Sequence, residues 1–137
     1  MRATMLASAA LLLGAIVSSA DQASKVRERD ASWVAPADRN ARANPLANRP
    51  DAVAGGRKLF HQRCSTCHGE DGRGTAYGPD LTTAEVQAQT DGALFWKISS
   101  GDTRTGMPGF SFLPEPQRWQ LVLHVRSHRG GTGSPQP

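Results

Sequence analysis

The sequence is poor in cysteine and in aromatic residues. Its 137 residues include two cysteines and one tyrosine, and aromatic residues make up 6% of the chain. With a single pair of cysteines there is no framework of several disulfides to hold a small exported domain together. No segment alternates polar and apolar residues clearly enough to predict a strand, and no internal repeat is visible. These absences exclude a disulfide-rich scaffold, a β-sandwich and a repeat architecture.

The chain also has no strong excess or clustering of charge of either sign. The formal net charge is +4, and the arginines are scattered among acidic residues without a basic stripe or a run of like charges. A nucleic-acid-binding domain normally concentrates its basic residues on one face or one element. We therefore expect no nucleic-acid partner.

The only long apolar run lies at the beginning of the chain. Arg2 precedes an apolar stretch at residues 5–17, and small residues follow at 18–20 before the charged Asp21. This order is typical of a secretory signal peptide. The alternative is an uncleaved membrane anchor, although the run is shorter than the ~20 residues that span a bilayer. We predict that residues 1–20 are a signal peptide and that the protein is exported to the periplasm.

Prolines and small residues dominate the next segment, residues 21–50, which we expect to be an extended leader with Trp33 held in a surface groove. Residues 51–129 are predicted to form the compact domain, and residues 130–137 a flexible tail. Asp51 is expected to cap a first helix in which Gly55 and Gly56 are costly. These glycines indicate that another backbone segment comes close to that helix.

Two further helices are expected in the compact domain. Thr90 can cap one that ends at Gly101, and the last helix is expected at about residues 115–128. The glycine-rich residues 69–81 and residues 101–114 are predicted loops. The result is an all-α domain with short helices and a thin core, which a large buried cofactor would complete.

The two cysteines lie in a C-x-x-C-H sequence, Cys64 to His68. This is the signature of covalent haem attachment, in which Cys64 and Cys67 form thioethers with one porphyrin and His68 ligates its iron. Three alternatives fit less well. A redox-active dithiol needs a βαβ context, a disulfide would close a very small loop, and a zinc site that recruits His61 would crowd its ligands.

A second iron ligand is expected in the mature chain. Met107 is the only methionine beyond the signal, and it lies in a loop between glycine and proline. A thioether ligand raises the reduction potential of a haem. The rival histidines are less suitable. His61 shares a helix with the attachment site, His124 is expected to pack in the core, and His128 is expected to be solvated.

With these residues in place, the chain resembles a class I cytochrome c over residues 51–129. Beyond C-x-x-C-H, the resemblance rests on Gly56-x-x-x-Phe60, the Gly-Pro-Asp-Leu of residues 78–81, the Gly-Met-Pro of residues 106–108, and the last helix. It implies that Pro79 accepts a hydrogen bond from the His68 ring and that Leu81 contacts the haem. One departure is His124, where the family usually has tyrosine. Its ring is still expected to pack against Phe60 and Gly56.

The resemblance implies one haem c with His68 and Met107 as axial ligands, and a one-electron carrier rather than an enzyme. Its partners would be redox proteins of the bacterial cell envelope, and it would meet the membrane only by docking to a membrane complex or through an uncleaved signal. The alternative is an electron-accepting subunit of a dehydrogenase or oxidase complex. The sequence names neither the electron donor nor the acceptor.

Overall fold

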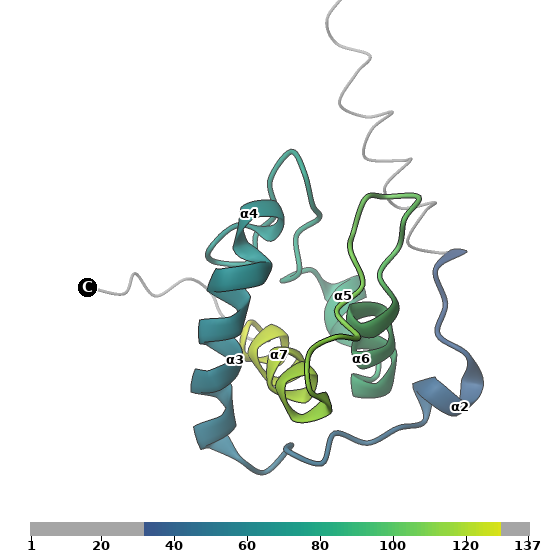
Figure 1. The fold of residues 1–137 in the computed structure, drawn as a ribbon, viewed down its shortest axis with the longest axis vertical. Coiled ribbons are helices and arrows are strands. Elements are labelled where there is room, and N and C mark those ends of the chain that lie inside the picture. The colour runs from purple at the N-terminus through teal and green to yellow at the C-terminus, as the bar shows by residue number, and fades with distance from the viewer. Residues whose placement is uncertain (1–31, 130–137) are drawn as a thin grey trace, which may run out of the picture. The chain divides into compact units, whose positions relative to one another are not determined.

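The structure is a computed structural model that describes residues 32–129. The expected all-α fold is confirmed, because the described residues form helices and no strand, apart from one isolated bridge between Asp102 and Met107. The helices are α2 (Ala37–Asn40), α3 (Pro50–Arg63), α4 (Ser65–His68), α5 (Ala84–Ala88), α6 (Asp91–Ser100) and α7 (Glu115–Ser127) (Figure 1). The predicted signal peptide and the predicted tail lie outside the described residues.

Helix α3 begins two residues earlier than expected. Pro50 is the first helical residue and Arg49 occupies the N-cap position, so the prediction of Asp51 as the cap was wrong. Proline suits this position because its φ is already helical and its missing N–H would have had no partner. Asp51 lies instead in the first turn and accepts hydrogen bonds from Arg49 at 3.0 and 2.9 Å, which lower the pKa of its carboxyl.

Helices α3 and α7 cross closely at the position of Gly56. A Cβ atom on Gly56 would lie 1.9 Å from the Gln120 carbonyl oxygen, so the expected close approach of another backbone segment is confirmed. A Cβ atom on Gly55 would meet only the end of the flexible Gln120 side chain. Phe60 is 1% exposed one turn further along α3, and its ring centroid lies 4.8 Å from that of His124. His124 therefore packs in the core as expected.

Both ends of α6 follow the sequence prediction. The Thr90 side chain accepts a hydrogen bond from the Ala93 amide, and Gly101 ends the helix with φ 65°. Helix α7 also begins at the expected residue. The short helix α5 was not predicted, because five residues capped by Thr83 are too few to show a helical repeat.

The buried side chains form two clusters, and α7 contributes residues to both. The first contains Val86, Leu94, Phe95, Trp119, Val122 and Val125. The second contains Phe60, Phe110, Leu113 and Leu121. The half-buried Leu81 and Ile98 pack against both. The core is therefore continuous from α3 to α6, and Leu81 belongs to its rim.

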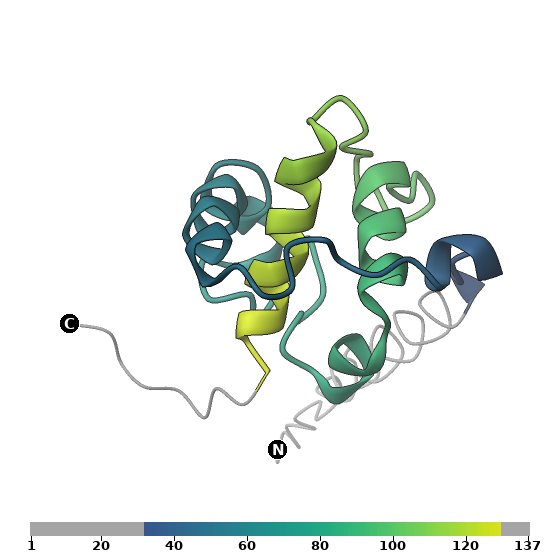
Figure 2. The ribbon, with the colours of Figure 1, turned by 90° about the horizontal axis from the view of Figure 1, so that it is seen from below.

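A strap of residues 33–49 crosses α6 and α7 before α3 begins (Figure 2). Thr90 donates to the Asn40 carbonyl at 2.7 Å, and the buried Asn44 donates to the Trp119 carbonyl at 3.3 Å. Trp33 is half-buried beside Trp96, with ring centroids 6.3 Å apart. The strap has no regular structure except for α2, and it belongs to the same compact unit as the helices that follow it. No helix in residues 32–129 combines the length and apolar character needed to cross a membrane.

Candidate haem-binding site

The two cysteines lie at the junction of α3 and α4. Cys64 is the last residue before α4 and Cys67 lies within it, and both thiols are free and half-buried. Burial, and secondarily Cys67, raises the pKa of Cys64 to about 11. No cluster of three or more potential metal-ligating residues of the histidine, cysteine or carboxylate types occurs in the described part of the chain.

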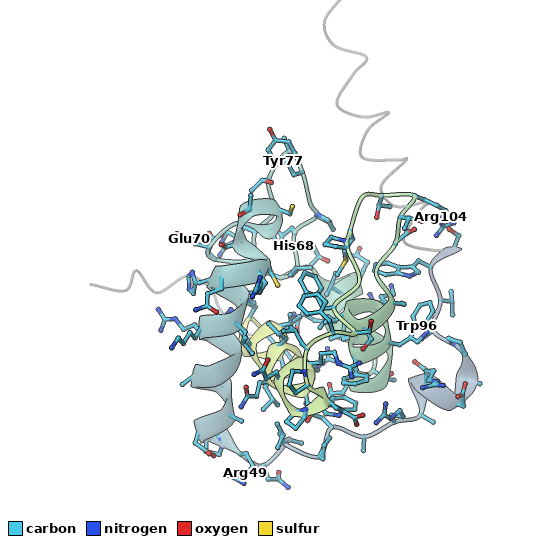
Figure 3. All side chains as sticks on the ribbon, viewed as in Figure 1. Arg49, His68, Glu70, Tyr77, Trp96 and Arg104 are labelled. Atoms are coloured by element: carbon cyan, nitrogen blue, oxygen red, sulfur yellow. The ribbon has the colours of Figure 1, made fainter. Side chains whose placement is uncertain are left out.

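His68 is buried at the end of α4, and its ring orientation is fixed by one hydrogen bond. Its Nδ1 lies 2.9 Å from the Pro79 carbonyl oxygen. A carbonyl can only accept, so Nδ1 carries the proton and Nε2 presents a lone pair. In Figure 3 the labelled His68 lies beside α4 and faces the interior between α3 and α6. A histidine held in this way is prepared to donate Nε2 to a metal.

The loop that carries Pro79 is folded back onto α4. The Gly74 amide donates to the His68 carbonyl at 2.7 Å, and the Thr75 hydroxyl donates to the Cys67 carbonyl at 2.6 Å. A Cβ atom on Gly78 would lie 2.8 Å from the same Cys67 carbonyl. The backbone of the loop and the attachment segment are therefore in direct contact, and this contact sets the position of the Pro79 carbonyl.

Leu81 is held by a residue that the sequence did not indicate. Gln87 donates from Nε2 to the Leu81 carbonyl at 2.8 Å and to the Val125 carbonyl at 2.9 Å. The side chain of Gln87 is buried and connects the loop to α7. No local signal could have identified it, because its partner in α7 is 38 residues away along the chain.

Met107 lies in a turn that begins where α6 ends. Its backbone pairs with that of Asp102 through two hydrogen bonds of 3.0 and 2.9 Å. The Asp102 carboxylate accepts a hydrogen bond from the Arg104 side chain, which lowers the pKa of Asp102. A Cβ atom on Gly101 would lie 2.4 Å from the Gly109 amide nitrogen. The two ends of the turn thus touch, and Met107 is half-buried on a well-anchored segment.

The rival histidines lie elsewhere. His61 is exposed on α3, and His124 is 6% exposed, with burial the main cause that lowers its pKa to about 4. His128 was expected to be solvated, and this was wrong. It is half-buried, its Nε2 is enclosed without a hydrogen-bond partner, and burial lowers its pKa. The ring can lie there because Gly72, with no side chain, lies directly against it.

The residues present fit a covalently bound haem. Leu59, Cys64, Leu81 and Ile98 pack against the second core cluster yet remain partly exposed. Such apolar surface is costly in water, and a porphyrin lying on it would remove that cost. The two thiols and the unprotonated Nε2 of His68 belong to the same segment. The donors are of the type that haem iron takes, a histidine nitrogen with a methionine sulfur available in the chain.

Comparison with known proteins agrees with this site. A family model described as cytochrome C oxidase, cbb3-type, subunit III matches residues 51–125. A curated relative, the cbb3-type cytochrome c oxidase subunit CcoP of Rubrivivax gelatinosus, is 48% identical over 40 residues, which are 29% of this chain and 13% of that protein. The chain therefore matches only a small part of the length of this relative.

Two solved structures are similar to the chain. One is cytochrome cL of the marine methylotrophic bacterium Methylophaga aminisulfidivorans, with a TM-score of 0.53, 28% identity, and coverage of 61% of this chain and 59% of that one. Another is the c-type cytochrome KustC0563, with a TM-score of 0.50, 34% identity, and coverage of 54% of this chain and 96% of that one. Since the family model covers more than half of the chain, the protein belongs to the cbb3-type subunit III family and is a class I cytochrome c with one covalently bound haem c that transfers electrons.

Proposed function

We propose that this protein is an exported one-electron carrier of the bacterial cell envelope, with the haem joined to Cys64 and Cys67 and its iron ligated by His68 and Met107. When bound, the haem supplies an Fe(III)/Fe(II) couple. The observation that carries the proposal is the hydrogen bond from His68 Nδ1–H to the Pro79 carbonyl, at 2.9 Å. This bond directs the lone pair of Nε2 and increases its basicity.

Met107 is the proposed ligand on the opposite side. The paired backbones of Asp102 and Met107 hold the turn in one conformation. A ligand on an anchored turn moves little when the charge on the metal changes, which favours fast electron exchange. Leu81 is proposed to contact the haem face, and its position at the rim of both core clusters supports this role.

The proposal assigns no enzymatic activity. His68 and Met107 would both hold the iron, which would leave no ligand position open to a substrate. Electron exchange then proceeds through brief contacts with redox proteins, for which small interfaces are sufficient. We further propose that residues 1–20 direct export to the periplasm, that residues 51–129 form the haem domain after the 21–50 leader, and that contact with the membrane occurs through docking or an uncleaved signal.

A second candidate function is supported by the match to the oxidase subunit CcoP. In that case the chain is an electron-accepting subunit that stays bound to a membrane complex. Fractionation of native cells separates the two. A carrier is released with the periplasmic fraction in high salt or, if its signal is uncleaved, elutes alone from gel filtration after detergent extraction. A subunit remains with one detergent-solubilised complex through gel filtration.

The ligand proposal is tested by optical spectroscopy of the matured holoprotein. The wild type should show the methionine-to-iron charge-transfer band when oxidised and no response to carbon monoxide when reduced. Met107→Ala should lose the band and bind carbon monoxide, and Thr103→Ala, an exposed change in the same turn, should behave as the wild type. Carbon monoxide binding by the wild type would overturn the closed-site carrier.

A further inference from the structure

A cavity separate from the haem site lies where the strap meets the helical body. Its volume is about 190 Å³, and α2, the strap, α6 and α7 contribute to it. The lining residues are Arg39, Arg42, Phe95, Trp96, Ser99, Glu115 and Arg118. In Figure 3 the labelled Trp96 lies beside α6 and α2, whereas His68 lies beside α4. None of the lining residues belongs to the proposed haem-binding set.

Two arginines of this cavity stack on the same aromatic ring. The Arg42 and Arg118 guanidinium carbons lie 4.8 and 4.7 Å from the centroid of Phe95. Phe95 is itself buried and stacked on Trp119 at 4.0 Å. Stacked guanidiniums lose less conformational freedom when they bind a ligand than exposed ones, so the cavity is preorganised.

The fixed arginines retain unused hydrogen-bond donors. Arg42 donates to Glu115 at 2.6 Å, and Arg118 donates to the Leu113 carbonyl at 3.1 Å and to the Ser99 hydroxyl at 2.6 Å. A guanidinium has five N–H donors. Within the described residues, most donors of Arg42 and several of Arg118 therefore have no protein acceptor.

The charges around the cavity are not balanced. Three guanidiniums line it against the single carboxylate of Glu115, and Asp38 pairs with Arg39 outside the lining at 3.0 Å. One positive charge remains in excess. Arg42 and Trp119 both donate to Glu115 and lower its pKa, so its carboxylate stays ionised and does not supply a proton to the cavity.

We propose that this cavity binds a small oxyanion, a phosphate or a short organic carboxylate, between the guanidiniums of Arg42 and Arg118. Planar guanidiniums recognise both groups through paired, charge-assisted hydrogen bonds. The small volume of the cavity suits a small anion. The aromatic rings of Phe95 and Trp96 would cover the carbon atoms of a carboxylate.

The test is calorimetric titration of the full-length holoprotein with inorganic phosphate and, separately, with succinate, at constant ionic strength set with sodium chloride. Saturable binding of at least one probe is expected at millimolar concentration or below. Arg118→Gln should weaken it about tenfold or more, because a hydrogen bond to a charged group is lost. Arg42→Gln serves as a second variant, in case the first loses its fold.

Two further variants distinguish specific binding in the cavity from nonspecific electrostatic attraction of the anion to the protein. Glu115→Gln keeps an acceptor for Arg42 and Trp119 but removes the competing charge, so the probe should bind about threefold or more tightly. Arg49→Gln changes an exposed arginine outside the cavity and should leave binding unchanged. The absence of saturable binding by both probes, or equal weakening by Arg49→Gln, would overturn the proposal.

Discussion

The Nδ1–H group of His68 donates to the carbonyl oxygen of Pro79 across 2.9 Å, and the loop that carries Pro79 lies on the backbone of Cys67. The ring orientation of the proposed iron ligand thus depends on a backbone contact between two segments. No substitution removes a carbonyl, so the contact is best disturbed through its neighbour Gly78.

Gly78→Ala should displace the loop, since the added Cβ would lie 2.8 Å from the Cys67 carbonyl. We expect a loss of about 1–3 kcal/mol in the free energy of unfolding and a higher reduction potential, because His68 loses the acceptor that makes its ring more basic, and a less basic ligand stabilises Fe(III) less. Urea denaturation and redox titration of the holoprotein measure both. Gly55→Ala, whose Cβ meets only a flexible side chain, is the control for adding a methyl group without a backbone collision, and it should not lose stability. An unchanged potential in Gly78→Ala would contradict the argument.

Gly101→Ala should disturb the turn that carries Met107. Gly101 has φ 65°, and its added Cβ would lie 2.4 Å from the Gly109 amide nitrogen. The expected result is a weakened methionine charge-transfer band and partial carbon monoxide binding. Gly106→Ala carries similar backbone strain at φ 83° but meets no atom within 4 Å, so it separates strain from collision. Equal spectra for the two variants would show that the collision is unimportant.

Gly56→Ala should force α3 and α7 apart, because the Gln120 carbonyl lies 1.9 Å from the position of the new Cβ. Although alanine is the better helix former by roughly 1 kcal/mol, we expect a net loss of about 3 kcal/mol in unfolding free energy, typical of a severe core collision. Chemical denaturation measures it. A stability equal to or above that of the wild type would mean that the helices separate at little cost.

Acid should destabilise the protein through His124. Its pKa is lowered to about 4, chiefly by burial. An unfolded histidine has a pKa of about 6.5, so the unfolded chain binds the proton first. Above pH 6.5 His124 is neutral in both states and does not reduce the free energy of unfolding. As the pH falls from 6.5 toward 4, proton binding by the unfolded chain reduces that free energy. We expect about 2 kcal/mol to be lost between pH 7.5 and 4.5 on this account.

His124→Phe isolates that contribution. It keeps a ring against Phe60 but removes the titrating nitrogen, so its unfolding free energy should depend less steeply on pH than that of the wild type. His61→Gln changes an exposed histidine whose charge is a minor cause of the lowered pKa of His124, so it should keep most of the wild-type dependence. Denaturation at several pH values measures the slopes. Parallel curves for His124→Phe and the wild type would exclude His124 as the cause.

The sequence by itself determined the features that depend on neighbouring residues. The Thr90 cap, the stop at Gly101 and the start of α7 follow local rules of helix formation, and the structure has all three. The C-x-x-C-H motif is equally local, because one porphyrin must meet both thiols and the next histidine. The cost of Gly56 indicated a close backbone approach without indicating its partner.

Only the tertiary structure decided which distant groups meet. It paired Gly56 with Gln120, placed Gln87 between Leu81 and Val125, and enclosed the ring of His128 against Gly72. It also brought Arg39 and Arg42 of the strap together with Arg118 of α7 at one cavity. These contacts depend on how the helices pack. Packing depends on the shapes of many side chains that are far apart in the sequence, so no short stretch of sequence is sufficient to predict it.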